Sequence, residues 1–202
     1  MSAKIPPKDG RPAVVIDPVA DPAFSELLRP LVPLHAAAGH ALPSVEVLPG
    51  EAIPEPYRTL LVHNRDMTRT LESHHGSTIR LRLLSTGREG DLYRRTVALV
   101  SEGDGKTVEF GATEAHLDRI PEPWRAEIVE GRHPLGGILN RSGIPYRSRP
   151  SAYFRTRGDA VIRAALGVVG EPWLYGRRNT LSDAEGRPLA EIVEILPPAS
   201  GA

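Results

Sequence analysis

The sequence predicts an α+β domain built on one antiparallel β-sheet. Three observations support this: residues 173–198 have the pattern of a β-hairpin, residues 77–114 have the pattern of three consecutive strands, and the helical segments are grouped between the strand runs. The regular strand–helix alternation that marks a parallel sheet is not visible in the sequence. At 202 residues, the chain fits one domain with a substantial core.

The N-terminal part of the chain divides into an arm and the start of the domain. Residues 1–20 are dense in Pro, Gly and charge and predict a flexible arm, with one apolar patch at Val14–Ile16. The domain is expected to span residues 21–198, followed by a disordered tail at 199–202. Two prolines interrupt the alanine-rich segment 21–39, which favours two short helical pieces. Residues 44–48 then predict a short strand.

The segment from Pro56 to Gly76 predicts one long helix. Pro56 suits a first-turn position and Gly76 suits a helix end. Met67 lies in the apolar stripe of this helix, and periodicity alone favours a core-filling role for it. The stripe consists of Leu60, Leu61, Asn64, Met67, Thr68 and Leu71.

Three strands of an antiparallel meander are expected at 77–84, 93–100 and 106–114, because the connections between them are short and rich in Gly, Ser and Asp. In the middle strand, Arg95 shares a face with apolar residues. An arginine in that position needs an anionic partner, either a protein carboxylate or a ligand. Arg94 points to the other face and is the candidate for exposure to solvent.

The segment between the meander and the hairpin predicts helices and one strand. Residues 115–130 form a short helical pattern that two prolines break, and residues 150–157 have the composition of a strand. A further helix is expected at 159–169, with Asp159 as its N-cap and Gly170 as its end.

The motif HPLGGIL at residues 133–139 admits two interpretations. Its paired glycines can let the backbone approach a ligand closely and offer N–H groups to an anion. The alternative is a plain helix start, which is the better account of the motif taken alone.

The C-terminal hairpin carries the charged residues of greatest interest. Its first strand ends in Arg177 and Arg178, whose guanidinium groups can hold an anion across the sheet. Its second strand places Glu191 and Glu194 among Leu, Ile and Val, on opposite faces, because successive strand residues alternate. Burial penalises a charged carboxylate, so one of the two glutamates should either be buried with a partner or lie at an exposed rim.

Composition excludes several classes of function. The chain has no cysteine, which rules out disulfides, thiolate zinc sites and a cysteine nucleophile. Its net charge is zero and its basic residues are spread along the chain, so no nucleic-acid partner is expected. No apolar run approaches the roughly 20 residues that cross a bilayer, and the N-terminus lacks a signal-peptide pattern. We therefore expect a cytoplasmic monomer without a membrane partner.

Five motifs in register resemble those of a known family. They are Met67-Thr68, Arg95 within YRRTVALV, HPLGGIL at 133–139, LYGRR at 174–178 and GRPLAEIVEILPP at 186–198. In order and spacing, these motifs are similar to those of the chorismate pyruvate-lyases, which make 4-hydroxybenzoate for ubiquinone-type pathways. The resemblance covers about residues 56–198.

This resemblance implies a six-stranded antiparallel sheet with helical flaps over a buried ligand site. It also implies a carbon–oxygen lyase that uses no metal or organic cofactor. Carried over by position, Arg95 would hold a substrate carboxylate, and Glu194 would lie by the ring oxygen and serve as acid or base. The backbone near Leu135 and Gly136 would supply N–H donors. The candidate site residues are Glu194 and Arg95 as catalytic groups, with Met67, Leu135, Gly136, Arg177 and Arg178 as substrate-binding groups.

The position of the family's glutamate depends on where counting starts. Counted from the turn at Gly186, it falls at Val193, and counted back from Pro198, it falls at Glu194. A β-bulge in the strand would reconcile the two counts. Glu194 is the preferred residue, and Glu191 is held in reserve.

The resemblance implies elimination of pyruvate from chorismate to give 4-hydroxybenzoate. Two other functions stay open. One is a non-catalytic sensor of an aromatic acid, because the effector domains of some transcription regulators resemble this fold. Such regulators carry a helix-turn-helix module, which the proline-interrupted first 55 residues do not predict. The other is a lyase for a modified chorismate in a secondary pathway.

Overall fold

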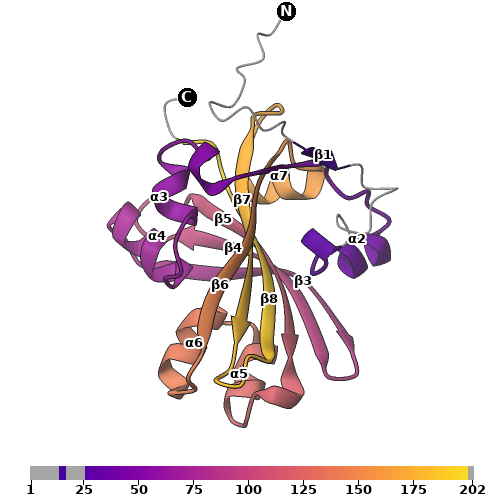
Figure 1. Ribbon diagram of the computed structural model, residues 1–202, viewed down its shortest axis with the longest axis vertical. Coiled ribbons are helices and arrows are strands. Elements are labelled where there is room, and N and C mark those ends of the chain that lie inside the picture. Colours follow the sequence, from indigo (N-terminus) through magenta and orange to yellow (C-terminus); the bar gives the residue numbers. More distant parts are fainter. Residues whose placement is uncertain (1–13, 17–25, 200–202) are drawn as a thin grey trace, which may run out of the picture.

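The computed structural model describes residues 14–16 and 26–199. Its centre is a single antiparallel sheet of eight strands in the order β1-β2-β6-β7-β8-β5-β4-β3 (Figure 1). This confirms the predicted α+β class, with a sheet larger than the expected six strands. The strands are β1 (Val14–Ile16), β2 (Val45–Leu48), β3 (Ile79–Glu89), β4 (Leu92–Ser101), β5 (Thr107–His116), β6 (Arg147–Thr156), β7 (Leu174–Ser182) and β8 (Pro188–Leu196).

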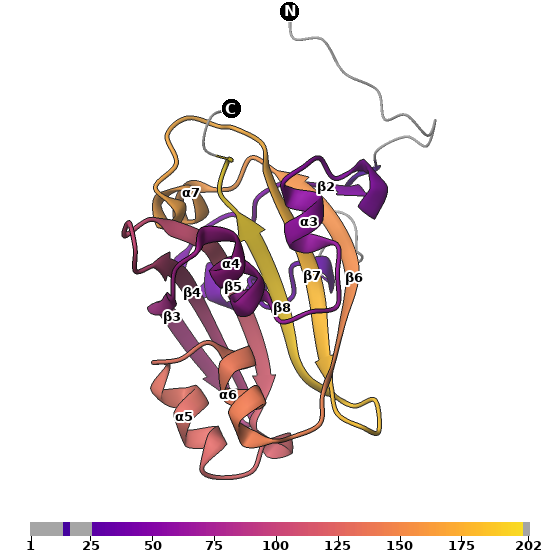
Figure 2. The ribbon, with the colours of Figure 1, turned by 90° about the vertical axis from the view of Figure 1, so that its left-hand side faces the viewer.

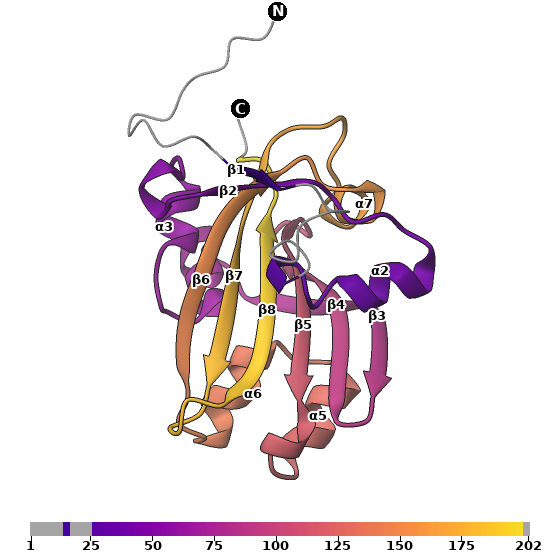
Figure 3. The same cartoon turned by 45° about the vertical axis from the view of Figure 1, so that its right-hand side comes forward.

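Helices cover both faces of the sheet. α3, α4 and α6 lie on one face, and α2 and α7 lie on the other (Figures 2 and 3). We call these the α4 face and the α2 face. Buried side chains of α3 and α4 pack on Val97 and Leu99, while Phe110 and Val193 pack under the α2 side. The helices are α2 (Val32–Ala38), α3 (Tyr57–Leu61), α4 (Met67–His75), α5 (Trp124–Glu130), α6 (Leu135–Ser142) and α7 (Ala160–Leu166), with 3-10 turns η1 (Gly50–Ala52) and η2 (Leu117–Arg119).

The C-terminal hairpin forms as predicted, from β7 and β8. Its turn is held by Asp183, whose Oδ1 accepts hydrogen bonds from the backbone N–H groups of Glu185 (3.1 Å) and Arg187 (2.8 Å). Gly186 has φ of 81°, a conformation that glycine adopts without strain. The hairpin then places β8 between β7 and β5, in the interior of the sheet.

A register shift occurs in the hairpin next to the turn. Leu181 pairs with Ala190, whereas the next residue of β7, Ser182, pairs with Pro188. One extra residue of β8 is therefore accommodated, which is the geometry of a β-bulge. The β-bulge that the two counts along this strand called for is therefore present, at the turn end of β8.

The long helix expected from Pro56 to Gly76 is wrong, because the structure has two helices. α3 ends at Leu61, and α4 begins at Met67 after Asp66, whose side chain accepts a hydrogen bond from Arg69 N. The carbonyl groups of Leu61 and His63 bind the side chain of Arg177 instead of continuing a helix. Tertiary hydrogen bonds thus outweigh the helical periodicity of the segment.

Several other boundaries differ from expectation. The strand expected at 77–84 is longer than predicted: β3 runs to Glu89 and pairs with β4 along its length. The last helix keeps Asp159 as its N-cap but ends at Gly167 rather than Gly170. The helical segment at 115–130 is broken as predicted, and HPLGGIL is the start of α6.

The predicted arm and tail fall mostly outside the described residues. Within the arm, β1 pairs antiparallel with β2, with Val15 opposite Glu46. In the tail, Ala199 N donates a hydrogen bond to the Tyr57 hydroxyl at 2.6 Å. None of the described helices is long and apolar enough to cross a bilayer.

Candidate functional site

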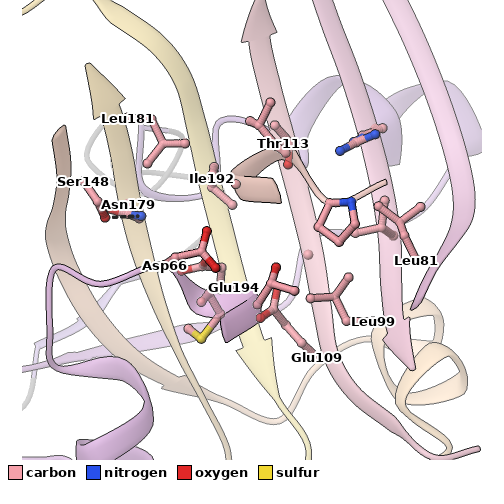
Figure 4. Close-up of a pocket in the computed structure, with 18 of the residues that line it drawn as sticks. Asp66, Leu81, Leu99, Glu109, Thr113, Ser148, Asn179, Leu181, Ile192 and Glu194 are labelled. Atoms are coloured by element: carbon pink, nitrogen blue, oxygen red, sulfur yellow. Dashed lines mark hydrogen bonds between the residues drawn. The ribbon is translucent and has the colours of Figure 1, made fainter. Parts of the chain in front are cut away.

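A small cavity lies between the α4 face of the sheet and the first residues of α4 and α6 (Figure 4). Residues of β4, β5, β7 and β8 form its floor, and Asp66, Met67 and Pro134 belong to its cover. The cavity holds about 60 Å³, which is room for roughly four to six water molecules. A ring-sized ligand needs more room than the cavity offers in this structure.

The structure brings five of the seven predicted site residues to this cavity. Arg95 and Glu194 share the α4 face, because Arg95 is opposite Thr113 and Thr113 is opposite Ile192, two residues before Glu194. The other three lining residues are Met67, Leu135 and Gly136.

Arg95 is a buried cation on the cavity wall. It is 2% exposed, and it donates hydrogen bonds to the carbonyl oxygens of Ile128 (3.3 Å) and His133 (3.2 Å). Its Nε has no partner among the described residues, and no described carboxylate forms an ion pair with it. Burial lowers the pKa of Arg95, yet a guanidinium stays protonated in proteins. The cavity therefore contains a positive charge that no described side chain neutralises.

Glu194 lines the same cavity and is 4% exposed. Its Oε2 accepts a hydrogen bond from Arg177 Nε, in a buried ion pair. Arg177 also donates through Nη1 to the carbonyl oxygens of Leu61 (3.0 Å) and His63 (2.9 Å). Arg177 does not line the cavity, so the expectation that it binds substrate is corrected: the anion that it holds is Glu194.

His63 adjoins this ion pair as a neutral imidazole. Burial, and next the charge of Arg177, lower the pKa of His63 to about 4. Nδ1 of the ring lies 3.4 Å from Arg177 Nη1, while Nε2 lies 2.7 Å from the Leu60 carbonyl oxygen. The uncharged ring therefore accepts from the guanidinium on one side and donates to the backbone on the other.

The predicted substrate contact of Arg178 is wrong, because Arg178 lies on the α2 face. There it binds Glu191 at 2.7 Å and Glu26 at 2.9 Å. Glu191 also accepts a hydrogen bond from the Thr180 hydroxyl at 3.0 Å. Both Glu191 and Arg178 are thus separated from the cavity by the sheet, so Glu191 is no longer an alternative to Glu194.

The expected exposure of Arg94 is also wrong. Arg94 is only 9% exposed, and its Nε donates to Glu114 Oε2 at 2.6 Å. Arg29 lies 3.2 Å from the other oxygen of Glu114. The α2 face is covered by the chain around α2, so an arginine pointing to that face is buried with a carboxylate.

Glu109 is a cavity residue that the sequence pattern does not single out. It is 4% exposed, and its Oε2 has no partner among the described residues. Burial, and next the charge of Glu194, raise the pKa of Glu109 well above its ordinary value. Figure 4 shows it on β5, with Glu194 on the adjacent β8. Only the cross-strand register, which a single sequence does not reveal, brings the two carboxyl groups together.

Further polar groups line the cavity floor. Asn179 and Ser148 hydrogen-bond to each other at 3.0 Å, and Thr113 lies next to Arg95 across the strand pair. In the described part of the chain, no three His, Asp or Glu side chains are grouped as metal ligands would be. The site therefore offers hydrogen-bond donors and acceptors, the guanidinium groups of Arg65 and Arg95, and the carboxyl groups of Asp66, Glu109 and Glu194.

Gly136, near the start of α6, lies against Asp66 at the start of α4. This contact predicts different effects for alanine at Gly136 and at the neighbouring Gly137. A Cβ at Gly136 would overlap with Asp66 Oδ2, whereas a Cβ at Gly137 would only touch Arg141 Nη1 at 3.6 Å. Asp66 caps α4, so we expect Gly136→Ala to cost about 0.5–2 kcal/mol of stability. Gly137→Ala should stabilise α6 by up to about 1 kcal/mol. Urea unfolding of both variants checks this, and equal effects would contradict the contact.

Comparisons with known proteins identify the fold but not a family. No family model matches the sequence, and no curated protein matches it significantly. PhnF from Mycobacterium smegmatis superposes with a TM-score of 0.53 and 16% identity, over 67% of this chain and 64% of PhnF. The chain thus spans less than two thirds of that protein. The separately solved effector domain of PhnF superposes with a TM-score of 0.52 and 16% identity, over 65% of this chain and 87% of that domain. At these identities, the comparison shows a shared fold.

Proposed function

We propose that the protein is a chorismate pyruvate-lyase that binds chorismate in the cavity beneath α4 and α6. The observation that carries this proposal is Arg95, a buried guanidinium on the cavity wall that no described carboxylate neutralises. A ligand carboxylate would supply the missing charge through short, charge-assisted hydrogen bonds. Glu194 lies on the same cavity wall. Four of the five motifs that resemble those of the chorismate pyruvate-lyases contribute half of the lining residues.

The reaction needs a group that holds the substrate in place and a base that accepts a proton from the ring. The bond between the ring and the enolpyruvyl oxygen breaks, and the ring carbon that bears the hydroxyl group loses its hydrogen as a proton. The electrons of that C–H bond complete the aromatic ring, and the leaving group takes up one proton and is released as pyruvate. Arg95 holds a substrate carboxylate and so fixes the ring, which removes much of the entropic barrier. Glu194, kept anionic beside Arg177, accepts the ring proton.

A direct assay tests this proposal. Purified protein is mixed with chorismate, and pyruvate and 4-hydroxybenzoate are followed. We expect Glu194→Gln to lower turnover by about 10² to 10⁴ fold, the usual contribution of a positioned acid or base. Glu185→Gln, in the exposed turn of the same hairpin, should retain full activity. A missing pyruvate signal at micromolar enzyme would rule out the proposed reaction of chorismate. Pyruvate released only when a ring-substituted chorismate is supplied would identify that modified chorismate as the substrate.

A second candidate function is a sensor of a small carboxylic acid. The shared fold with the effector domain of PhnF favours it, and the same cavity and the same Arg95 would bind the ligand. Calorimetry with 4-hydroxybenzoate distinguishes the two: tight binding without turnover of chorismate supports the sensor.

A further inference from the structure

Glu109 has no part in the reaction described above, although it lies in the same cavity. It is 4% exposed, it lines the cavity, and its Oε2 is buried without a partner among the described residues. Buried polar atoms in folded proteins nearly always have a hydrogen-bond partner. A ligand in the cavity can supply the hydrogen-bond partner that this oxygen lacks among the described residues.

The carboxyl group of Glu109 lies close to that of Glu194. Gly111 is directly opposite Glu194, and a Cβ at Gly111 would lie 3.2 Å from Glu109 Oε1. The side chain of Glu109 thus folds over Gly111, into space that only a glycine leaves open. Arg95 is opposite Thr113, two residues further along β5. Two strand residues span roughly 7 Å. The carboxyl group of Glu109, at the position of Gly111, and Arg95, opposite Thr113, therefore lie about that far apart along the strand direction in one cavity.

Burial and neighbouring charges favour the protonated form of Glu109. Glu194 already forms an ion pair with Arg177, so an ionised Glu109 would bring a second carboxylate beside it in a dry space. Burial, the charge of Glu194 and, more weakly, that of Asp66 raise its pKa, while Arg177 opposes them. The protonated carboxyl group, which can donate a hydrogen bond, is therefore favoured more than in an ordinary glutamate. The titratable and charged groups around it are Glu194, Arg177, Asp66, Arg65, Arg95 and Tyr146.

We propose that Glu109 is a second ligand-binding group, which donates a hydrogen bond from Oε2 to an oxygen atom at the end of the ligand remote from the carboxylate that Arg95 holds. This inference rests on the proposed binding of a carboxylate in the cavity. It narrows the ligand class to small rings with a carboxylate at one position and a hydroxyl or ether oxygen on the opposite side. Glu109 thus determines specificity, while Arg95 provides the anchor.

Calorimetry with benzoate and 4-hydroxybenzoate tests the proposal, because the two probes differ only in the remote oxygen. We expect the wild-type protein to bind 4-hydroxybenzoate about tenfold more tightly than benzoate, the effect of one buried hydrogen bond. Glu109→Leu should lose this preference and keep its affinity for benzoate. Glu109→Gln should keep the preference, because an amide N–H replaces the carboxyl donor.

The pH dependence gives a second readout. The donor is present below the pKa of Glu109 and is lost as the pH rises through it, so the wild-type preference should fall with increasing pH. The Glu109→Gln variant lacks this titration, and ionisation of the probe's own hydroxyl affects both proteins equally. Infrared difference spectra of wild type against Glu109→Gln should show a protonated carboxyl band in the free wild-type protein only.

The two proposals fail in different ways. Equal wild-type affinity for the two probes, an unchanged preference in Glu109→Leu, or no protonated carboxyl band would each overturn the role of Glu109, even if pyruvate is released from chorismate. A preference that depends on Glu109, without any release of pyruvate, supports the role of Glu109 and rules out the lyase.

Discussion

Replacing Arg95 with methionine is expected to lower the affinity for benzoate and 4-hydroxybenzoate by about 100-fold or more. The guanidinium would meet the ligand carboxylate in a water-poor cavity, where paired charge-assisted hydrogen bonds are strong. Methionine keeps much of the side-chain volume and removes the charge. Calorimetry measures the loss, and ligand-induced stabilisation against heat should disappear with it. Arg80→Met is the matched control, because Arg80 is an exposed arginine on the adjacent strand β3.

The stability of the Arg95→Met protein separates an anchoring role from a structural one. The change removes a buried charge that no described carboxylate compensates, which favours folding, and it also removes two hydrogen bonds to carbonyl groups, which opposes folding. We expect the free energy of unfolding to change by no more than about 1–2 kcal/mol. A much larger loss, with ligand affinity retained, would show that Arg95 serves the fold rather than the ligand.

Local rules were sufficient for much of the fold and for the strand faces that Arg95 and Glu194 occupy. The alternation of strand residues places Arg95 with the apolar residues of β4 and separates Glu191 from Glu194. The hairpin turn follows from Asp183 and Gly186, whose roles depend on nearby backbone groups only. These predictions succeed because each rests on interactions within a few residues along one strand or turn.

Other features depend on contacts between distant segments, which a single sequence does not reveal. Alternation correctly assigns Arg94 to the opposite face, but burial of that face depends on the chain around α2 and on Glu114 from β5. The break between α3 and α4 depends on Arg177, more than 100 residues further along the chain. Glu109 joins the site only through its register with β8.

The ion pair of Arg177 and Glu194 should show the largest effect on stability. Arg177 is fully buried, and the side chain of Glu194 is 6% exposed. Glu194→Leu leaves a guanidinium in the interior without its carboxylate, and we expect it to cost about 3–5 kcal/mol. Arg177→Met should cost a similar amount, because it leaves Glu194 unpaired and removes the donor to the carbonyl groups of Leu61 and His63. Urea unfolding of both variants measures these losses.

A double-mutant cycle tests whether the two residues act as a pair. The double variant should lose less stability than the sum of the single variants, with a coupling of up to about 3 kcal/mol, because neither charge is then left alone. Glu191→Leu on the α2 face is the comparison: its partner Arg178 keeps Glu26 at 2.9 Å, so a smaller loss is expected. Additive losses at Arg177 and Glu194 would mean that the guanidinium does not neutralise Glu194. The assignment of Glu194 as an anionic base in a dry cavity would then lose its electrostatic support.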